Sequence, residues 1–89
     1  EIVELGSGVT GWKHGDRVAV YNIVPGADAH KFPPSMLQCS PGKKVLGVNT
    51  GKVGAFAEYI CVPAHNAAKL DDAVPFPIAL LSEPLAVSY

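Results

Sequence analysis

The stretch Gly15-Asp16-Arg17-Val18-Ala19-Val20-Tyr21-Asn22-Ile23 determines the class of fold that this chain can adopt. It opens with a Gly-Asp pair, which favours a tight turn because glycine adopts backbone angles that other residues avoid. The residues that follow are mostly β-branched, apolar or aromatic, and Val18 and Val20 share one face of an extended chain. The stretch therefore predicts a turn that leads into a β-strand over residues 17–23.

Further β-type segments occur on both sides of this strand. They are short and apolar, and glycine and proline separate them, so we expect extended chain over residues 2–5, 45–48, 54–62 and 67–70. Nine glycines and eight prolines in 89 residues leave little room for long helices. The pattern predicts a small β-barrel or rolled sheet.

Two parts of the chain depart from the β pattern. Residues 24–44 have no periodicity and contain several prolines, which predicts a long loop or lobe. In residues 76–89, Ile78, Leu81 and Leu85 fall at helical spacing, and Pro84 is expected to kink the helix or to start a second one. The predicted fold class is mainly β with a C-terminal helical segment.

Composition and charge exclude several classes of partner. Seven basic and eight acidic residues give a net charge of −1, so no basic surface is available for nucleic acid. No apolar run approaches the ~20 residues of a membrane-spanning helix, so no membrane partner is expected. Cys39 and Cys61 form neither a disulfide framework nor a paired metal motif, which predicts reduced thiols in a cytoplasmic protein.

Three segments together resemble the medium-chain dehydrogenase/reductase superfamily, in its branch of zinc-dependent alcohol, sorbitol and threonine dehydrogenases. They occur in the order and at the spacing of that family and extend over nearly the whole chain. The segments are Glu1-Ile2-Val3-Glu4-Leu5-Gly6-Ser7-Gly8-Val9 with Gly15-Asp16-Arg17-Val18, then Gly54-Ala55-Phe56-Ala57-Glu58-Tyr59 with Val62-Pro63-Ala64 and Lys69-Leu70, and finally Leu81-Ser82-Glu83-Pro84-Leu85-Ala86-Val87.

The resemblance implies a GroES-like catalytic domain, which in an intact α/β enzyme is paired with a Rossmann domain that binds NAD or NADP. It also implies an oxidoreductase that transfers a hydride between a secondary alcohol or polyol and that cofactor, with zinc as a Lewis acid. Residues 1–89 are then a partial catalytic domain, and residues 76–89 lead into the Rossmann domain. Family members of this kind are expected to form homo-oligomers.

The resemblance assigns one site residue to this chain, Glu83. It matches the family glutamate that reaches the catalytic zinc or the water bound to it, so Glu83 is expected to be both the catalytic and the metal-site residue. A carboxylate beside Pro84, near a helix start, could instead serve only as a local cap. The other family zinc ligands and the Gly-x-Gly-x-x-Gly turn have no counterpart here, so no cofactor-binding residue is assigned. We expect a fragment that is inactive alone.

Many relatives hold a second, structural zinc ion in the lobe that corresponds to residues 24–44, through four cysteines. In this chain the matching positions are Pro25, Asp28, Lys31 and Cys39. Proline cannot bind zinc and lysine is a poor ligand, so too few donors remain for a tetrahedral site. Residues 24–44 are therefore predicted to be a degenerate structural-zinc lobe that has lost its metal, with His30 exposed rather than bound.

Two other functions are compatible with the sequence. A free-standing GroES-like module could bind a protein partner, although Met36-Leu37 is shorter than the hydrophobic tripeptide expected of a co-chaperonin loop. A zinc-independent quinone or enoyl reductase would agree with the degenerate lobe. The length of that lobe and the Glu83-Pro84-Leu85 segment favour the zinc-dependent branch.

Overall fold

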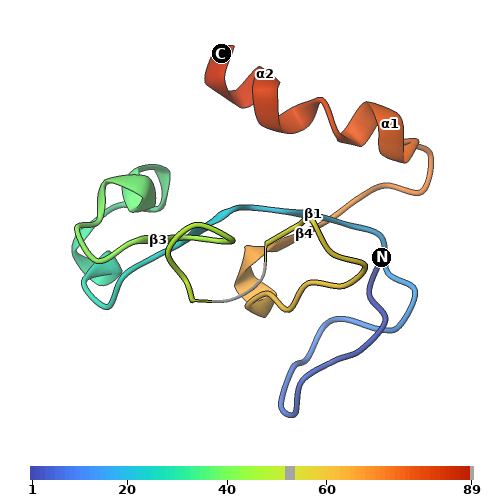
Figure 1. The fold of residues 1–89 in the computed structure, drawn as a ribbon, viewed down its shortest axis with the longest axis horizontal. Coiled ribbons are helices and arrows are strands. Elements are labelled where there is room, and N and C mark those ends of the chain that lie inside the picture. The colour runs from blue at the N-terminus through green and yellow to red at the C-terminus, as the bar shows by residue number, and fades with distance from the viewer. Residues whose placement is uncertain (52–53, 89) are drawn as a thin grey trace. The chain divides into compact units, whose positions relative to one another are not determined.

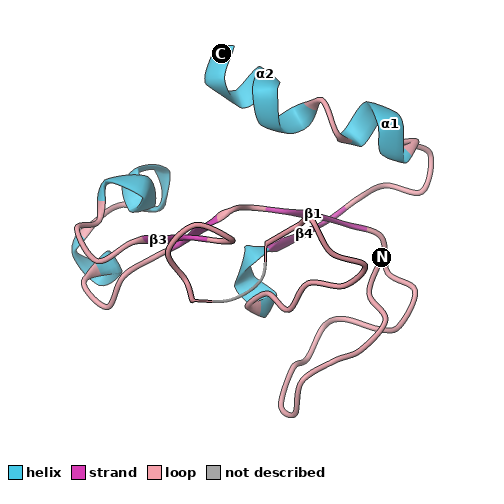
Figure 2. Ribbon diagram, viewed as in Figure 1, coloured by secondary structure: helices cyan, strands magenta, loops and turns pink. Residues whose placement is uncertain are grey.

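The computed structural model describes residues 1–51 and 54–88 (Figure 1). Its strands and α-helices are short, and most of the described backbone is loop and turn (Figure 2). Contacts divide the chain into two compact units, one made of Glu1–Ala19 with the segment from Ala67 onward, and the other of Val20–Asn66. The elements are β1 (Val18–Val20), β2 (Ile23–Val24), η1 (Ala29–Lys31), η2 (Pro34–Cys39), β3 (Lys44–Val45), η3 (Ala64–Asn66), β4 (Ala67–Lys69), α1 (Phe76–Ala79) and α2 (Ser82–Ser88), where η denotes a 3₁₀ helix.

The first unit is organised around the pairing of β1 with β4. The Arg17 carbonyl accepts a hydrogen bond from the Leu70 backbone N–H at 2.9 Å. On the other side of the Gly15-Asp16 turn, Ile2 exchanges two backbone hydrogen bonds with residues 15 and 16, at 2.8 and 2.9 Å. Gly15 has a φ of +86°, a conformation that favours glycine. The turn predicted from the sequence is therefore confirmed, and extended chain lies beside it.

In the second unit β2 and β3 form an antiparallel pair, in which Ile23 faces Val45 and Val24 faces Lys44. The buried Asn66 side chain donates hydrogen bonds to the carbonyls of Tyr21 and Ile23, both at 2.7 Å. These carbonyls are thus bound by a side chain instead of by a neighbouring strand. The strand predicted over residues 17–23 is consequently divided into β1 and β2, with a break at Tyr21 and Asn22.

The structure confirms a mainly β fold with a C-terminal helical segment, but several predicted strands are shorter or absent. Residues 2–5 and 54–62 contain no assigned strand, and Phe56 and Tyr59 project into solvent. An extended segment becomes a strand only when a neighbouring backbone pairs with it, which apolar alternation alone does not provide. The strand predicted over residues 45–48 ends at Val45, as β3. Beyond it the chain forms a turn, in which the Asn49 side chain accepts a hydrogen bond from the Val45 N–H. Only the run at residues 67–70 is confirmed closely, as β4.

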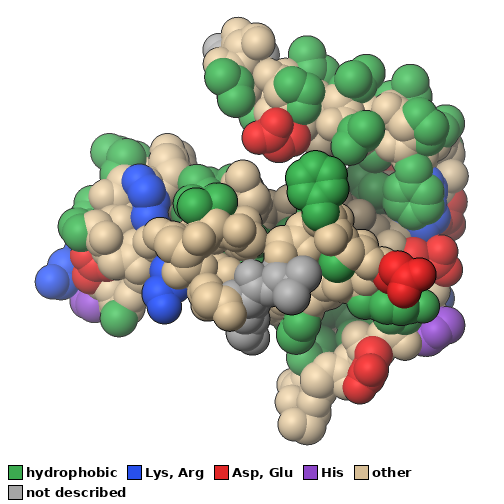
Figure 3. Space-filling view, in the orientation of Figure 1, with side chains coloured by type: hydrophobic (Ala, Val, Ile, Leu, Met, Phe, Trp, Pro, Cys, Tyr) green, Lys and Arg blue, Asp and Glu red, His purple; other side chains and the backbone are tan. Residues whose placement is uncertain are grey.

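The C-terminal segment is helical, as predicted. Helix α1 begins after Pro75, and α2 begins at Ser82 with Pro84 in its first turn, where the missing proline N–H costs no hydrogen bond. Apolar side chains of both helices are exposed, as Figure 3 shows along this part of the chain. They are Phe76, Ile78, Leu85 and Val87, and Leu80 and Leu81 in the turn between the two helices are exposed as well. No helix within the described residues is long and apolar enough to cross a membrane.

The buried side chains of this structure are polar. Asp16, Ser40 and Asn66 are buried, whereas no hydrophobic side chain is buried among residues 1–51 and 54–88. Hydrogen bonds and one ion pair, rather than an apolar core, therefore connect the segments. This is a weak basis for independent stability, because hydrophobic burial is the dominant favourable contribution to folding.

We predict that residues 1–89 expressed alone do not unfold cooperatively. Without buried apolar side chains, the hydrophobic contribution cannot offset the conformational entropy lost on folding. Amide hydrogen exchange and thermal circular dichroism would measure this, and we expect exchange close to that of an unstructured chain and no sigmoidal transition. A protected set of amides that opens in a single transition would contradict the prediction.

Candidate functional site

Glu83, the predicted site residue, lies in the first turn of α2 and is exposed. A carboxylate at this position interacts favourably with the positive end of the helix, which gives a local capping role a physical basis. Within the part of the chain that the structure describes, no three His, Cys, Asp or Glu side chains come together as a group that could hold a metal ion. Glu83 therefore has access to solvent, but the described residues do not complete a metal site around it.

Asp16, in the Gly15-Asp16 turn, is a buried carboxylate with two partners. Its Oδ2 accepts a hydrogen bond from the Lys13 backbone N–H at 3.0 Å, and its Oδ1 lies 3.3 Å from the Lys69 ammonium on β4. The hydrogen bond from Lys13 and the charge of Lys69 lower the pKa of Asp16 below its ordinary value, against the opposing effect of burial. The carboxylate thus joins the turn to β4 in its charged form.

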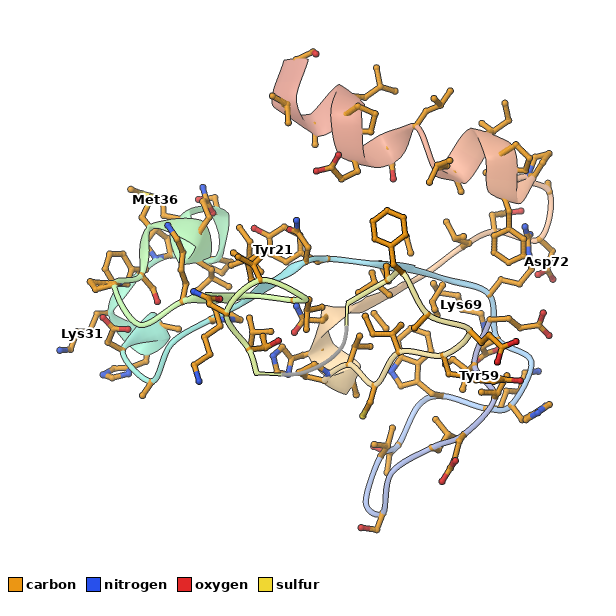
Figure 4. All side chains as sticks on the ribbon, in the orientation of Figure 1. Tyr21, Lys31, Met36, Tyr59, Lys69 and Asp72 are labelled. Carbon is orange, nitrogen blue, oxygen red and sulfur yellow. The ribbon has the colours of Figure 1, made fainter. Side chains whose placement is uncertain are left out.

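Arg17, the next residue, binds the segment of the same unit that leads from β4 to α1. Its Nη1 donates to the carbonyls of Asp71 and Asp72, both at 3.1 Å, and its Nη2 donates to the Val74 carbonyl at 2.6 Å. The guanidinium carbon also lies 4.3 Å from the centre of the Phe76 ring. In Figure 4, Lys69 is labelled on β4 and Asp72 in the segment that leads to α1. These contacts tie the Gly15-Asp16 turn to the start of the helical segment.

Sequence reasoning did not find these roles of Asp16 and Arg17. The motif indicated a turn, but the side-chain partner Lys69 of Asp16 and the carbonyl acceptors of Arg17 lie between 53 and 57 positions further along the chain. No local pattern links them. The available signal was an Asp-Arg pair at the entrance to a strand, since charged residues at such a position need partners when they are buried.

We predict that the stabilising effect of Asp16 depends on pH. Because its pKa is lowered in the folded state, its contribution is fully present above the ordinary Asp pKa of about 3.9 and is lost as the pH falls through the folded-state value. In the intact protein, Asp16→Asn should lower the melting temperature most at neutral pH. The difference in melting temperature from the unmodified protein should become smaller toward pH 3. The matched control is Asp72→Asn, an exposed carboxylate. A gap that stays constant over this range would contradict the assignment.

The lobe of residues 24–44 is closed by a buried serine. The Ser40 side chain is fully buried, and its Oγ accepts a hydrogen bond from the Gly26 N–H at 3.1 Å and donates one to Asp28 Oδ1 at 3.2 Å. Gly26 and Gly42 also lie so close that a Cβ on Gly26 would come within 2.5 Å of the Gly42 backbone. The two ends of the lobe thus meet through a hydrogen-bonded hydroxyl and a close glycine–glycine approach.

The residues at the four family zinc positions do not fit a zinc ion. Asp28 accepts a hydrogen bond from Ser40, Lys31 and Cys39 are exposed, and Pro25 has no donor atom in its side chain. His30 is exposed, and its Nδ1 lies 3.1 Å from the Ala27 carbonyl oxygen, not beside a cysteine. A structural zinc site requires four donors in a tetrahedron. We assign no chemistry to a metal in this lobe.

We predict that Ser40→Ala loosens the lobe in the intact protein, whereas a zinc chelator does not. Loss of the buried hydroxyl leaves the Gly26 N–H and Asp28 without this partner, at a cost of about 1–3 kcal/mol. Limited proteolysis within residues 24–44 should be faster in Ser40→Ala than in Ser35→Ala, which alters an exposed serine of the same lobe. Faster cleavage after chelation, with Ser40→Ala unchanged, would show that a metal holds the lobe.

These features define a small β domain whose strand-entry turn is fixed by charged partners and which continues into a helical segment. Residues 1–72 match the alcohol dehydrogenase GroES-like domain family, and the chain belongs to this family. The match confirms the resemblance carried by the first two of the three sequence segments, whereas the third, residues 81–87, lies beyond the matched range.

Full-length relatives are similar along nearly the whole chain. The chain is 36% identical over 85 residues to an L-threonine 3-dehydrogenase of Ruegeria pomeroyi, and 36% identical over 90 residues to one of Chelativorans sp.. A third, from Aeromonas hydrophila, is 35% identical over 89 residues. The alignments cover 94–96% of this chain but only 24% of each relative, so the chain spans about a quarter of their length. No solved structure matches the chain.

Proposed function

We propose that this chain is part of an NAD(P)-linked oxidoreductase of the alcohol dehydrogenase family, and that it is inactive alone. The observation that carries the proposal is the family match over residues 1–72. In such a reaction the carbon that bears a secondary hydroxyl gives a hydride to the nicotinamide ring and the hydroxyl loses its proton. The alcohol is thereby oxidised to a ketone while NAD(P)⁺ is reduced to NAD(P)H.

The relatives' name suggests the first substrate to test. They are L-threonine 3-dehydrogenases, and the 3-hydroxyl of threonine is a secondary alcohol of the predicted class. We therefore propose a small alcohol substrate, with L-threonine before polyols such as sorbitol. The similarity covers 24% of those enzymes, so three quarters of each relative lies outside the aligned segment.

In this proposal residues 1–89 are a partial GroES-like catalytic domain, residues 24–44 are its degenerate zinc lobe, and residues 76–89 lead into a Rossmann domain; Tyr89 lies outside the described residues. The exposed apolar side chains of α1 and α2 support the last assignment, because a helix with apolar residues exposed around it is normally covered by other protein. An intact cytoplasmic enzyme that forms homo-oligomers is part of the same proposal.

Glu83 is the residue proposed to act in the catalytic site. Its exposed carboxylate in the first turn of α2 is free to reach a group that approaches from outside the chain. A bound zinc ion would supply a positive charge that polarises the substrate oxygen. One carboxylate is far short of a zinc coordination shell, so the described donors alone do not fit the metal, and no step is assigned to it.

The test uses the intact protein that contains this chain. Its mass should be several times 9.3 kDa, and it should reduce NAD⁺ or NADP⁺ with L-threonine or a polyol. We predict that Glu83→Gln lowers kcat/KM by roughly 10–100-fold, the usual range for residues that support a metal site. The matched control is Glu58→Gln, an exposed glutamate of the second unit, which should retain activity.

Other outcomes would favour the alternatives. Reduction of a quinone or an enoyl substrate by a protein without zinc would point to the zinc-independent reductases. A native mass close to 9.3 kDa would exclude hydride transfer and favour a binding module. Full activity of Glu83→Gln would remove the proposed role of this carboxylate.

A further inference from the structure

Arg17 binds the backbone of the segment that precedes α1 through a geometry that only arginine provides. Its two terminal nitrogens reach three carbonyl oxygens, those of Asp71, Asp72 and Val74. The planar guanidinium can satisfy several acceptors at fixed angles, whereas a lysine ammonium acts as a single flexible point charge. The three carbonyls lie within one four-residue turn, which the hydrogen bond from the Val74 N–H to the Asp71 carbonyl closes, so the side chain fixes the path of residues 71–74 as a whole.

The same guanidinium also fixes the first residue of α1. It lies 4.3 Å from the centre of the Phe76 ring, within the range of a cation–π contact. Helix α1 has no side-chain cap at its start, where Pro75 is extended. Arg17 therefore restrains this helix start in two ways, through the backbone before it and through the ring at its first position.

The start of α1 determines the direction of the segment that carries Glu83. Backbone hydrogen bonds continue from Leu80 N–H to the Phe76 carbonyl, from Leu81 N–H to Ile78, and from Leu85 N–H to Leu81, so α1 and α2 follow each other closely. Glu83 is seven residues beyond Phe76, across α1, the turn at Leu80 and Leu81 and the start of α2, and a fully helical rise over this span would be about 10 Å. A tilt of about 10° at Phe76 would thus move Glu83 by about 2 Å, and a misplacement of about 1 Å can cost on the order of 10²-fold in rate.

We propose that Arg17 is a positioning residue for Glu83: by anchoring residues 71–76 it sets the direction of α1 and α2 and thereby the place of the Glu83 carboxylate. This inference rests on the proposed function, because Glu83 has its role there. Arg17 itself touches no reacting atom. Its anchoring of the helical segment, however, is independent of any activity and is measured separately.

The first experiment follows the anchoring by hydrogen exchange of the intact protein. In Arg17→Met, amides of residues 76–88 should exchange at least about tenfold faster than in the unmodified protein, with residues 23–46 unchanged. Phe76→Leu, which removes only the ring contact, should give a smaller increase. The matched control is Lys13→Met, which removes an exposed positive charge near the same turn; among the described residues the Lys13 side chain makes no ion pair with residues 71–76. Unchanged exchange over residues 76–88 in Arg17→Met would overturn the proposal.

The second experiment uses kinetics at a temperature where every variant is folded. Arg17→Met should lower kcat about tenfold or more while KM for the cofactor changes less than about threefold, and Arg17→Lys should recover part of the loss. Combined with Glu83→Gln, Arg17→Met should cause little further loss, because both changes affect one carboxylate. Unchanged kcat in folded Arg17→Met, or a fully additive loss in the double variant, would overturn the positioning role.

The two experiments separate the inference from the proposed function. If Glu83→Gln leaves activity intact, the proposed role of Glu83 fails and its positioning by Arg17 fails with it, whereas the exchange data still decide whether Arg17 anchors the helices. If Glu83→Gln loses activity but Arg17→Met does not, the function stands and only the inference is wrong. If Arg17→Met does not fold, both hydrogen exchange and kinetics are measured on Arg17→Lys and Phe76→Leu instead.

Discussion

The interaction on which the rest of the first unit depends is the pair of opposite charges in the Gly15-Asp16-Arg17 turn. Asp16 binds Lys69 on β4, and Arg17 binds the carbonyls of residues 71–74, so two adjacent side chains hold two consecutive parts of a distant segment. Such contacts matter more here than in most domains, because no hydrophobic side chain is buried among the described residues. With no apolar core, the geometry depends on directional bonds that specify distance and angle.

The second unit is also held by directional hydrogen bonds, made here by two neutral side chains. Asn66 binds the carbonyls of Tyr21 and Ile23 at the β1–β2 break, and Ser40 joins Gly26 to Asp28 at the base of the lobe. Both side chains are buried, so their hydrogen bonds are protected from competition with water. In the lobe, a buried hydroxyl thus connects Gly26 with Asp28, and this short polar side chain bridges the two ends of the loop.

If the chain is part of a larger enzyme, as proposed, the polar framework explains how it can serve that enzyme. The framework fixes turns and helix starts, while the exposed apolar side chains of α1 and α2 would be covered by the proposed Rossmann domain. Under the proposed function, Glu83 lies at the junction between these two regions. Its carboxylate is carried by helices whose direction is set within the β domain, and its remaining partners come from elsewhere in the protein. A site shared between domains in this way depends on accurate placement of each contributing segment.

The sequence by itself determined the family and the mainly β class. It also determined the turn at Gly15-Asp16, strand β4 and the helical tail with its break near Pro84. These features depend on local backbone preferences or on motifs that lie within a few residues. It also showed that Pro25 and Lys31 are unsuited to a zinc site. The role of Glu83 remains a prediction from the motif around it. Only the tertiary structure decided that the strand over residues 17–23 is broken and that residues 54–62 form no strand. It also decided that Asp16 and Arg17 connect segments within the first unit and that Ser40 does so within the second. Such contacts join residues that are far apart in sequence, and a hydrogen bond or ion pair leaves no periodic trace in either segment, so the pairing appears only when the folded chain brings them within reach.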